Sequence, residues 1–254
     1  MDPYLYLNRM NVDEGKKGEG SLTFLRHLQY QHMLHIPFEN QDVMRHVPIH
    51  LDIEKFYEKI VLRNRGGFCY ELNGLFHWLL QELGYSSHLI SGTVRKPDGS
   101  WALDDSHAAI LVSLHEPYLV DVGFGDSVRI PVPLSGEVID DGVGVYRVKE
   151  RKEDFLFEVE KNKEWVTLYR FRTEPKNLSD FTPMCHYNQT SPNSRFTQES
   201  IATKALERGR VTLLDNTLKI IENDNKTERT IHPTEKCKIL KKYFGIELED
   251  LSSS

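Results

Sequence analysis

The apolar residues of this chain change their spacing near Tyr85, and this change limits the possible folds more than any other feature of the sequence. Before Tyr85 they recur every three or four positions, which is typical of amphipathic helices. After it they tend to alternate with polar residues in short segments separated by Gly, Pro, Asp and Lys, which is typical of strands joined by turns. Helices followed by strands indicate an α+β fold, because α/β folds alternate the two kinds of element.

The part before Tyr85 contains three predicted helices. The first begins after Ser21, a residue type that caps helix N-termini, and Pro37 ends it. The second covers residues 51–62. The third begins near Cys69 and stops before Gly84, because its apolar side chains follow the i, i+3, i+4, i+7 spacing of one helix face: Leu72, Leu75, Phe76, Leu79, Leu80 and Leu83.

The part after Tyr85 is expected to be mainly β-structure. The predicted strands are 87–92, 108–114, 118–122, 145–148, 155–160 and 165–171. Short strands at such close spacing favour an antiparallel barrel or a sandwich. Toward the end of the chain we expect a helix at 200–208, strands at 210–214 and 218–222, and a last helix from Pro233 to about Phe244.

Charge and cysteine content exclude several classes of protein. The formal net charge of −6 counts against a nucleic-acid partner, because such proteins hold phosphates with clustered Lys and Arg. No apolar run is long enough to span a membrane, and the N-terminal residues do not resemble a secretory signal. Cys69, Cys185 and Cys237 stand far apart, so we expect no disulfide framework, no metal site and a reducing, cytoplasmic environment.

Cys69 is the strongest candidate for a nucleophile. It follows Gly66 and Gly67, which permit a sharp turn and the close approach of a ligand, and it lies at the first turn of a predicted helix. The unpaired N–H groups and the positive end of the helix dipole favour a thiolate there and could receive an oxyanion. The competing interpretation is a buried structural cysteine, and the local pattern does not choose between the two.

A nucleophilic cysteine needs a base, and His107 is the best placed of the histidines. His77 lies two turns along the Cys69 helix, about 12 Å away, which is too far to reach the sulfur. His32 belongs to a group in or beside predicted surface helices and loops. His107 instead follows a polar loop and begins an apolar strand, a position that holds a side chain rigidly at the edge of a cleft.

Asp121 is the candidate for the group that orients the base. It lies within an apolar strand, where a carboxylate is costly unless another group pairs with it. A hairpin centred on Leu114 would bring His107 and Asp121 directly opposite one another, with their Cβ atoms about 5 Å apart. A turn centred nearer 116–117 would separate them by several residues, and the sequence alone does not choose.

Five segments form an ordered set along the chain: Ile-Pro-Phe-Glu-Asn at 36–40, Arg-Gly-Gly-Phe-Cys-Tyr-Glu-Leu-Asn at 65–73, His107 with its apolar strand, Asp-Val-Gly-Phe-Gly at 121–125, and 188–197, preceded by Asp180 and Phe181. In this order and spacing they resemble the motifs of the arylamine N-acetyltransferase family. The likeness covers about residues 20–200. The chain lacks the inter-domain insertion and long C-terminal tail of vertebrate members, so it resembles the bacterial type.

The resemblance implies a fold and a mechanism. The implied parts are a helical bundle at 1–84 that carries the nucleophile, a β-barrel at 85–195 that carries the base and the acid, and an α/β lid at 196–254. Cys69, His107 and Asp121 would form a papain-like triad. Acetyl-coenzyme A would acetylate Cys69, coenzyme A would leave, and an aromatic amine or hydrazine would then attack the thioester in a ping-pong cycle.

The resemblance also implies binding residues. The side chains expected to line an aromatic substrate pocket are Phe38, Phe124 and Phe196, and those expected near acetyl-coenzyme A are Ser106, Gly125, Tyr187 and Asn193. Glu39 and Arg65 are expected to form a structural ion pair that braces the cysteine motif. The segment 95–99 could touch the phosphates of the coenzyme, although a solvated turn is the simpler interpretation.

Two other functions remain open on the sequence. A related amide synthase or a transglutaminase-like cysteine hydrolase would use the same triad, because the choice of donor and acceptor lies in the pocket. A non-enzymatic binding module with this fold is the second alternative, and the presence of all three triad residue types counts against it. Neither the oligomeric state nor the preferred amine can be predicted.

Overall fold

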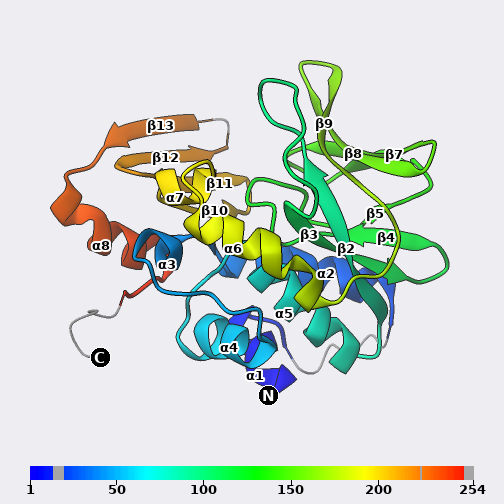
Figure 1. Ribbon diagram of the computed structural model, residues 1–254, viewed down its shortest axis with the longest axis horizontal. Helices are drawn as coiled ribbons and strands as arrows, with labels where there is room; N and C mark the ends of the chain where they lie inside the picture. Colours follow the sequence, from blue (N-terminus) through cyan, green and yellow to red (C-terminus); the bar gives the residue numbers. More distant parts are fainter. Residues whose placement is uncertain (14–19, 224, 249–254) are drawn as a thin grey trace.

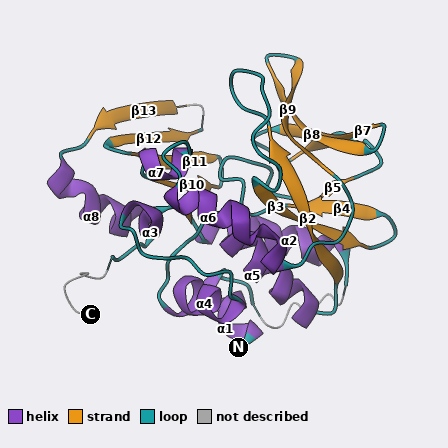
Figure 2. Ribbon diagram, viewed as in Figure 1, coloured by secondary structure: helices purple, strands orange, loops and turns teal. Residues whose placement is uncertain are grey.

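The computed structural model describes residues 1–13, 20–223 and 225–248 and contains a helical part, an eight-stranded sheet and a five-stranded sheet (Figures 1 and 2). The helical part comprises α1 (Pro3–Arg9), α2 (Leu22–His35), α3 (Gln41–Met44), α4 (Ile53–Tyr57), the π-helical turn η1 (Glu58–Leu62) and α5 (Cys69–Glu82). The three predicted helices are confirmed as α2, α4 with η1, and α5. Helices α1 and α3 are additional.

The ends of α2 and α5 follow from their sequences. Ser21 Oγ accepts the N–H of Phe24 and caps α2, which ends just before Pro37. In α5 the carboxylate of Glu71 accepts the N–H of Phe68 at 3.1 Å, which fixes the first turn of the helix. The position of Cys69 at this turn is therefore set by local hydrogen bonding.

The strands after Tyr85 form one antiparallel sheet that curls into a nearly closed barrel. They are β2 (Ser86–Val94), β3 (His107–Ser113), β4 (Pro117–Val120), β5 (Val132–Pro133), β6 (Ile139–Asp140), β7 (Val145–Arg151), β8 (Asp154–Lys161) and β9 (Glu164–Phe171). Their order is β5-β4-β3-β2-β9-β8-β7-β6, and β5 also lies against β7. The predicted α+β class is confirmed, and of the two predicted β-architectures the barrel is the one observed.

Alternate side chains of β3 face opposite sides of the sheet, as the pleat of a strand requires. Ala108 and Ile110 pack with the helical part, whereas Ala109 and Leu111 join the apolar interior of the barrel. Helix α5 packs on the outer side of β2 and β3. The start of α5 and the start of β3 therefore come together at the rim of the barrel.

The second sheet is antiparallel throughout and has the order β1-β10-β11-β12-β13. Its strands are β1 (Phe38–Glu39), β10 (Ile201–Leu206), β11 (Gly209–Leu214), β12 (Thr217–Glu222) and β13 (Asn225–Thr230). Val211 and Leu218 on one face pack against Leu240 and Phe244. These last residues belong to the C-terminal helical segment η3 (Pro233–Glu235), α8 (Lys236–Ile239) and η4 (Leu240–Phe244), as predicted from Pro233 onward.

The helix predicted at 200–208 is wrong, because Ile201–Leu206 forms strand β10. This strand pairs with β1 on one side and β11 on the other, so its hydrogen bonds depend on residues far away in the sequence. Strands 210–214 and 218–222 are confirmed as β11 and β12, and β13 was not predicted. The division of the chain after residues 84 and 195 stays a prediction.

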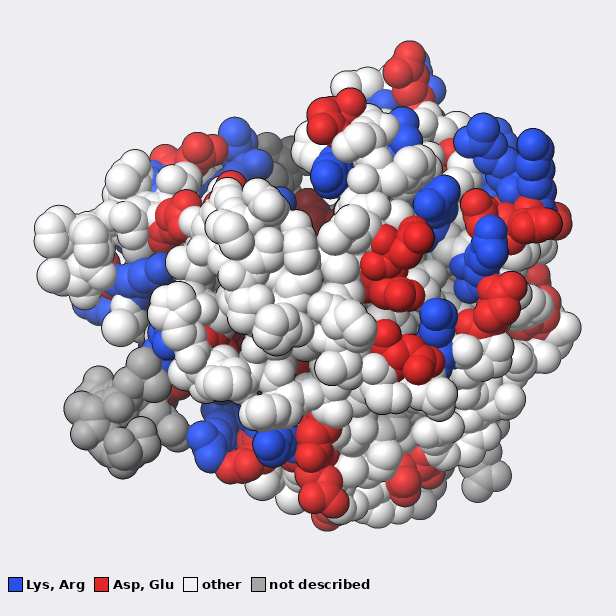
Figure 3. All heavy atoms as spheres, viewed as in Figure 1, with Lys and Arg blue, Asp and Glu red and all other residues white. Residues whose placement is uncertain are grey.

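The segment between the two sheets contains η2 (Leu178–Phe181), α6 (Thr182–Thr190) and α7 (Arg195–Gln198), none of which was predicted. In Figure 1, α6 crosses the region between the barrel and the second sheet. Acidic and basic side chains are interspersed over the face drawn in Figure 3. Within the described residues, no helix combines the length and the apolarity needed to cross a membrane.

Candidate active site

Cys69 lies at the start of α5 and is buried, with 3% of its surface exposed. Two glycines explain how the chain packs so closely around it. A Cβ on Gly66 would lie 2.0 Å from the carbonyl oxygen of Pro37, and one on Gly123 would lie 2.8 Å from the Cα of Cys69. A side chain at Gly66 would push the Pro37 backbone away from the cysteine motif, and one at Gly123 would push residue 123 away from Cys69.

A buried cluster of charges braces the segment before Cys69. The guanidinium of Arg65 lies 2.8 Å from Glu39 and 2.7 Å from Asp42, which confirms the ion pair expected from the sequence. Lys59 adds contacts to Asp42 at 2.7 Å and Glu71 at 2.8 Å. Burial alone would lower the pKa of Lys59, but the surrounding carboxylates outweigh it and raise that pKa. The cluster therefore fixes Arg65 and Glu71, which lie before and after Cys69 in the cysteine motif.

His107 and Asp121 meet although neither of the two predicted hairpin turns is correct. Ser113 pairs with Pro117, so the turn is centred between the two predicted positions. This register places Asp121 diagonally across from His107 on the same face, within reach of longer side chains. His107 Nε2 lies 2.7 Å from Asp121 Oδ2. The other ring nitrogen, Nδ1, is left for Cys69.

The charges around the His107 ring support a protonated imidazole. His107 is 2% exposed, and burial by itself would lower its pKa. The Asp121 carboxylate and the Cys69 thiol act in the opposite direction and raise the pKa of His107 above its ordinary value. Such an imidazole can accept a proton from the thiol and hold it.

Asp121 is completely buried, and each of its oxygens has more than one partner. Oδ1 accepts hydrogen bonds from Asn73 Nδ2 and the Gly123 N–H, both at 2.9 Å, and Oδ2 accepts one from the Tyr169 hydroxyl at 2.9 Å as well as contacting His107. Burial tends to raise the pKa of Asp121, but His107 and these donors lower it below its ordinary value. The carboxylate is therefore held ionised.

Asn73 and Tyr169 were not singled out as site residues from the sequence. Asn73 Nδ2 also donates to the Ala108 carbonyl at 2.6 Å, and its Oδ1 accepts the Val122 N–H at 3.0 Å, so it joins α5 to β3 and to the segment that follows β4. Its position four residues after Cys69, on the same face of the predicted helix, is a signal that could have identified it. Tyr169 comes from β9, and the sequence offers no comparable signal for it.

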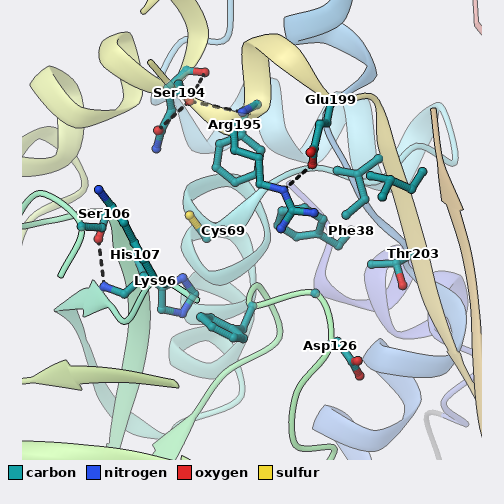
Figure 4. Close-up of a pocket in the computed structure, with 18 of the residues that line it drawn as sticks. Phe38, Cys69, Lys96, Ser106, His107, Asp126, Ser194, Arg195, Glu199 and Thr203 are labelled. Carbon is teal, nitrogen blue, oxygen red and sulfur yellow. Dashed lines mark hydrogen bonds and ion pairs between the residues drawn. The ribbon is translucent and has the colours of Figure 1, made fainter. Parts of the chain in front are cut away.

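A cavity of about 1090 Å³ opens next to Cys69 and His107. It is lined by every predicted site residue except Asp121, which lies behind His107: Cys69, His107, Phe38, Ser106, Phe124, Gly125, Tyr187, Asn193 and Phe196. Figure 4 shows the Cys69 sulfur between Ser106 on one side and Phe38 and Thr203 on the other. Further lining residues that were not predicted include Met184, Asn188 and Arg210.

The predicted binding residues around the cavity include aromatic rings that contact one another and a serine hydroxyl that is already hydrogen-bonded. The rings of Phe38 and Phe196 lie 6.0 Å apart, and Phe124 contacts the His107 ring edge-on at 5.2 Å. Ser106 Oγ accepts the Val94 N–H, so this hydroxyl already supports the loop. The 95–99 turn is largely exposed and its first residues line the cavity.

The family model for N-acetyltransferases matches residues 21–252. The chain is 31% identical to an arylamine N-acetyltransferase of Bacillus cereus whose crystal structure superimposes with a TM-score of 0.91 over 98% of this chain and 100% of that one. It is 30% identical to the arylamine N-acetyltransferase of Mycobacterium marinum in complex with CoA, with a TM-score of 0.88 over 96% of this chain and 93% of that one. The chain belongs to the arylamine N-acetyltransferase family.

As a member of this family the protein is an acyltransferase, as the sequence predicted. An acetyltransferase of Bacillus subtilis (strain 168) is a further relative, 32% identical over 82% of each chain. The Bacillus cereus structure is described as having a Cys-His-Glu catalytic triad. In the present acetyltransferase an aspartate, Asp121, occupies the position next to His107. Glutamate is one methylene longer than aspartate.

Proposed function

We propose that this acetyltransferase transfers the acetyl group of acetyl-coenzyme A to an aromatic amine or hydrazine through an acetyl-cysteine on Cys69. The observation that carries the proposal is the position of Cys69 at a helix start, facing a large cavity beside the His107–Asp121 pair. Family membership supports the acyl transfer, and the relative described in complex with CoA supports the donor.

In the first half-reaction His107 takes the thiol proton and the Cys69 sulfur attacks the thioester carbonyl of the donor. The first N–H groups of α5 stabilise the negative oxygen of the tetrahedral intermediate. The carbon–sulfur bond to coenzyme A then breaks, and His107 returns the proton to the departing coenzyme A thiolate. Asp121 keeps the imidazole in the required orientation throughout.

In the second half-reaction the amine nitrogen attacks the acetyl-Cys69 thioester. The nitrogen–carbon bond forms, the carbon–sulfur bond to Cys69 breaks, and His107 passes the amine proton to the departing Cys69 thiolate. Phe38, Phe124 and Phe196 would hold the aromatic ring, since ring pairs in edge-to-face and offset arrangements are favourable. Ser106, Gly125, Tyr187 and Asn193 would lie along the donor. We also infer a cytoplasmic site of action.

Intact-mass measurement after incubation with acetyl-coenzyme A tests the first half-reaction. We expect one acetyl group on the wild type, none on Cys69→Ala, and discharge of the acetyl group by aniline with formation of acetanilide. Cys185→Ala is a matched control, because Cys185 is also buried but hydrogen-bonds to Gln189 and lies outside the cavity lining. A folded wild-type protein that gains no acetyl group would refute the proposal.

The same experiment separates the two alternatives within the cysteine-triad superfamily. A hydrolase would lose the acetyl group to water at a rate that added aniline does not change. An amide synthase that closes its own acyl chain would accept a long amino-acyl thioester and leave acetyl-coenzyme A unused. We expect aniline to accelerate the loss of the acetyl group from Cys69.

A further inference from the structure

The peptide group between Asp121 and Val122 is bound at both of its polar atoms by carboxamide side chains from two helices. Its N–H donates to Asn73 Oδ1 of α5 at 3.0 Å. Its carbonyl oxygen accepts a hydrogen bond from Gln29 Nε2 of α2 at 3.3 Å. A peptide group is planar, so rotating it changes the backbone dihedral angles of the residues on either side. The two amides therefore fix the backbone that carries the Asp121 carboxylate.

The amide of Gln29 is itself oriented by a second carbonyl. Its Nε2 also donates to the carbonyl of Val128 at 3.3 Å, and because both neighbours are acceptors, the amide nitrogen must face them. Val128 precedes Arg129, whose N–H donates to the Asp141 carboxylate at 2.9 Å and whose guanidinium is bound to the β10–β11 turn. Val128 is thus a fixed point from which the amide reaches Asp121.

Gln29 is expected to contribute little to stability. Its side chain has no exposed surface, and its Oε1 has no protein partner within the described residues. An unpaired buried acceptor costs about as much as one or two ordinary hydrogen bonds contribute, and the two bonds of Nε2 are slightly long. An apolar side chain of the same length should therefore be tolerated here. It would, however, release the Asp121 carbonyl.

The position of Gln29 separates this effect from substrate binding. In the part of the chain that the structure describes, no side chain of α2 lines the cavity. The residues just after Asp121 do line it, but there the Gly125 carbonyl accepts a hydrogen bond from Arg210 of β11. Loss of the Gln29 amide should therefore disturb Asp121 and leave the cavity-lining part of this segment in place.

We propose that Gln29 is a positioning residue for the acetylation of Cys69, because it holds the backbone of Asp121 so that the carboxylate meets His107. This assignment rests on the proposed function and adds to it a residue outside the cavity. Asn73 binds one side of the peptide group and Gln29 the other. Without Gln29 the peptide group can rotate, and the 2.7 Å contact between Asp121 and His107 forms in only a fraction of the molecules.

The test replaces Gln29 by methionine, which has a similar length and no donor. We expect the limiting rate of Cys69 acetylation at saturating acetyl-coenzyme A to fall about tenfold, the equivalent of one hydrogen bond. The concentration of acetyl-coenzyme A that gives half of this rate should stay unchanged. The Tm should change by less than about 3 °C, because the lost hydrogen bonds and the removed unpaired oxygen offset each other.

A double-mutant cycle shows whether Gln29 acts through the Asp121 carboxylate. In Asp121→Asn the carboxylate is already absent, so we expect Gln29→Met to change the acetylation rate less than about twofold in that background. A residue that only supported the fold would give the same tenfold loss in both backgrounds. Single-turnover mass measurements provide the rates of all four proteins.

Gln31→Met is the matched control. Gln31 lies two positions along α2, so it faces a different side of the helix. It is partly exposed and, like Gln29, has an Oε1 without a protein partner among the described residues. We expect this variant to keep the wild-type acetylation rate and Tm.

Three results would overturn the assignment. The first is a wild-type rate of acetylation in folded Gln29→Met, and the second is an equal loss in the wild-type and Asp121→Asn backgrounds. The third is an unchanged limiting rate with a higher half-saturating concentration of acetyl-coenzyme A, which would give Gln29 a role in donor binding. Absence of Cys69 acetylation in the wild type would instead refute the proposed function itself, so the wild type is measured first.

Discussion

Two buried histidines of this protein, His107 and His32, have opposite electrostatic surroundings. Both side chains are almost completely removed from water. His107 contacts the carboxylate of Asp121, and its pKa is raised. His32 contacts the hydroxyl of Tyr6 at 3.0 Å, and burial together with the charges of Arg9 and His35 lowers its pKa to about 3. A buried imidazole therefore becomes a base only where a carboxylate compensates the cost of its charge.

The largest effect is expected from removing that carboxylate. Asp121→Asn keeps the size of the side chain but leaves His107 without a negative partner, so the imidazole loses both its orientation and its raised pKa. We expect the rate of Cys69 acetylation at neutral pH to fall about 10³- to 10⁴-fold. Single-turnover mass measurements would detect this change, and a loss below tenfold would contradict the assigned role.

Asp121→Glu sharpens the same comparison, since a relative with a Cys-His-Glu triad is known. Here the carboxylate has no exposed surface and already accepts hydrogen bonds from Asn73, Gly123 and Tyr169. An added methylene must displace at least one of them. We expect the variant to be more active than Asp121→Asn and at least about tenfold less active than the wild type, because overpacking a buried site costs about 1–3 kcal/mol.

Asn73→Ala should give the next largest effect. The amide makes three kinds of contact: with the Asp121 carboxylate, the Ala108 carbonyl and the Val122 N–H. Truncation leaves these buried groups without a partner, which should lower the free energy of unfolding by about 3 kcal/mol. Acetylation should slow by about 10- to 100-fold, because the Asp121 carboxylate loses the amide that holds it beside His107. Gln81→Ala, at a more exposed position of α5, serves as the control in urea denaturation.

Local sequence marked Cys69, His107 and Asp121 as candidates and left their mutual contacts open, whereas the cavity wall on the second sheet could not be predicted. Cys69, His107 and Asp121 each stand at an element boundary or interrupt an apolar strand, and these are features of a few adjacent residues. Lys219 becomes a cavity residue only through the pairing of β10, β11 and β12. The wrong helix at 200–208 has the same origin, because a single segment does not reveal its partners.

The burial of His32 could not be predicted from the sequence either. Its helix was expected at the surface, but His32 is buried and contacts the rings of Tyr6 and Phe76. Tyr6 belongs to α1, a helix that was not predicted. Because α1 was not predicted from the sequence, His32 was wrongly expected near the surface.

The pH dependence of stability should distinguish the two histidines. The pKa of His32 lies below its ordinary value of 6.5 in the folded protein, so the unfolded chain binds the proton more readily and stability falls as the pH drops from 6.5 toward 3. At pH 5 this amounts to about 2 kcal/mol. His32→Gln should flatten this part of the profile. For His107 the sign is reversed: its contribution is complete below pH 6.5 and is lost as the pH rises through its raised folded value.

The smallest effect is expected from Tyr169→Phe. The substitution removes one hydroxyl donor from Asp121 Oδ2 and keeps the ring contacts with His107 and Phe124. Three donors remain on the carboxylate, counting the His107 ring, so Asp121 stays ionised. We expect acetylation to slow about fivefold and the lower pH limit of activity to move upward, because one less hydrogen bond stabilises the charged form of Asp121. A pH–rate profile of single-turnover acetylation measures both, and a uniform loss of rate with an unchanged profile would show that Tyr169 acts only through packing.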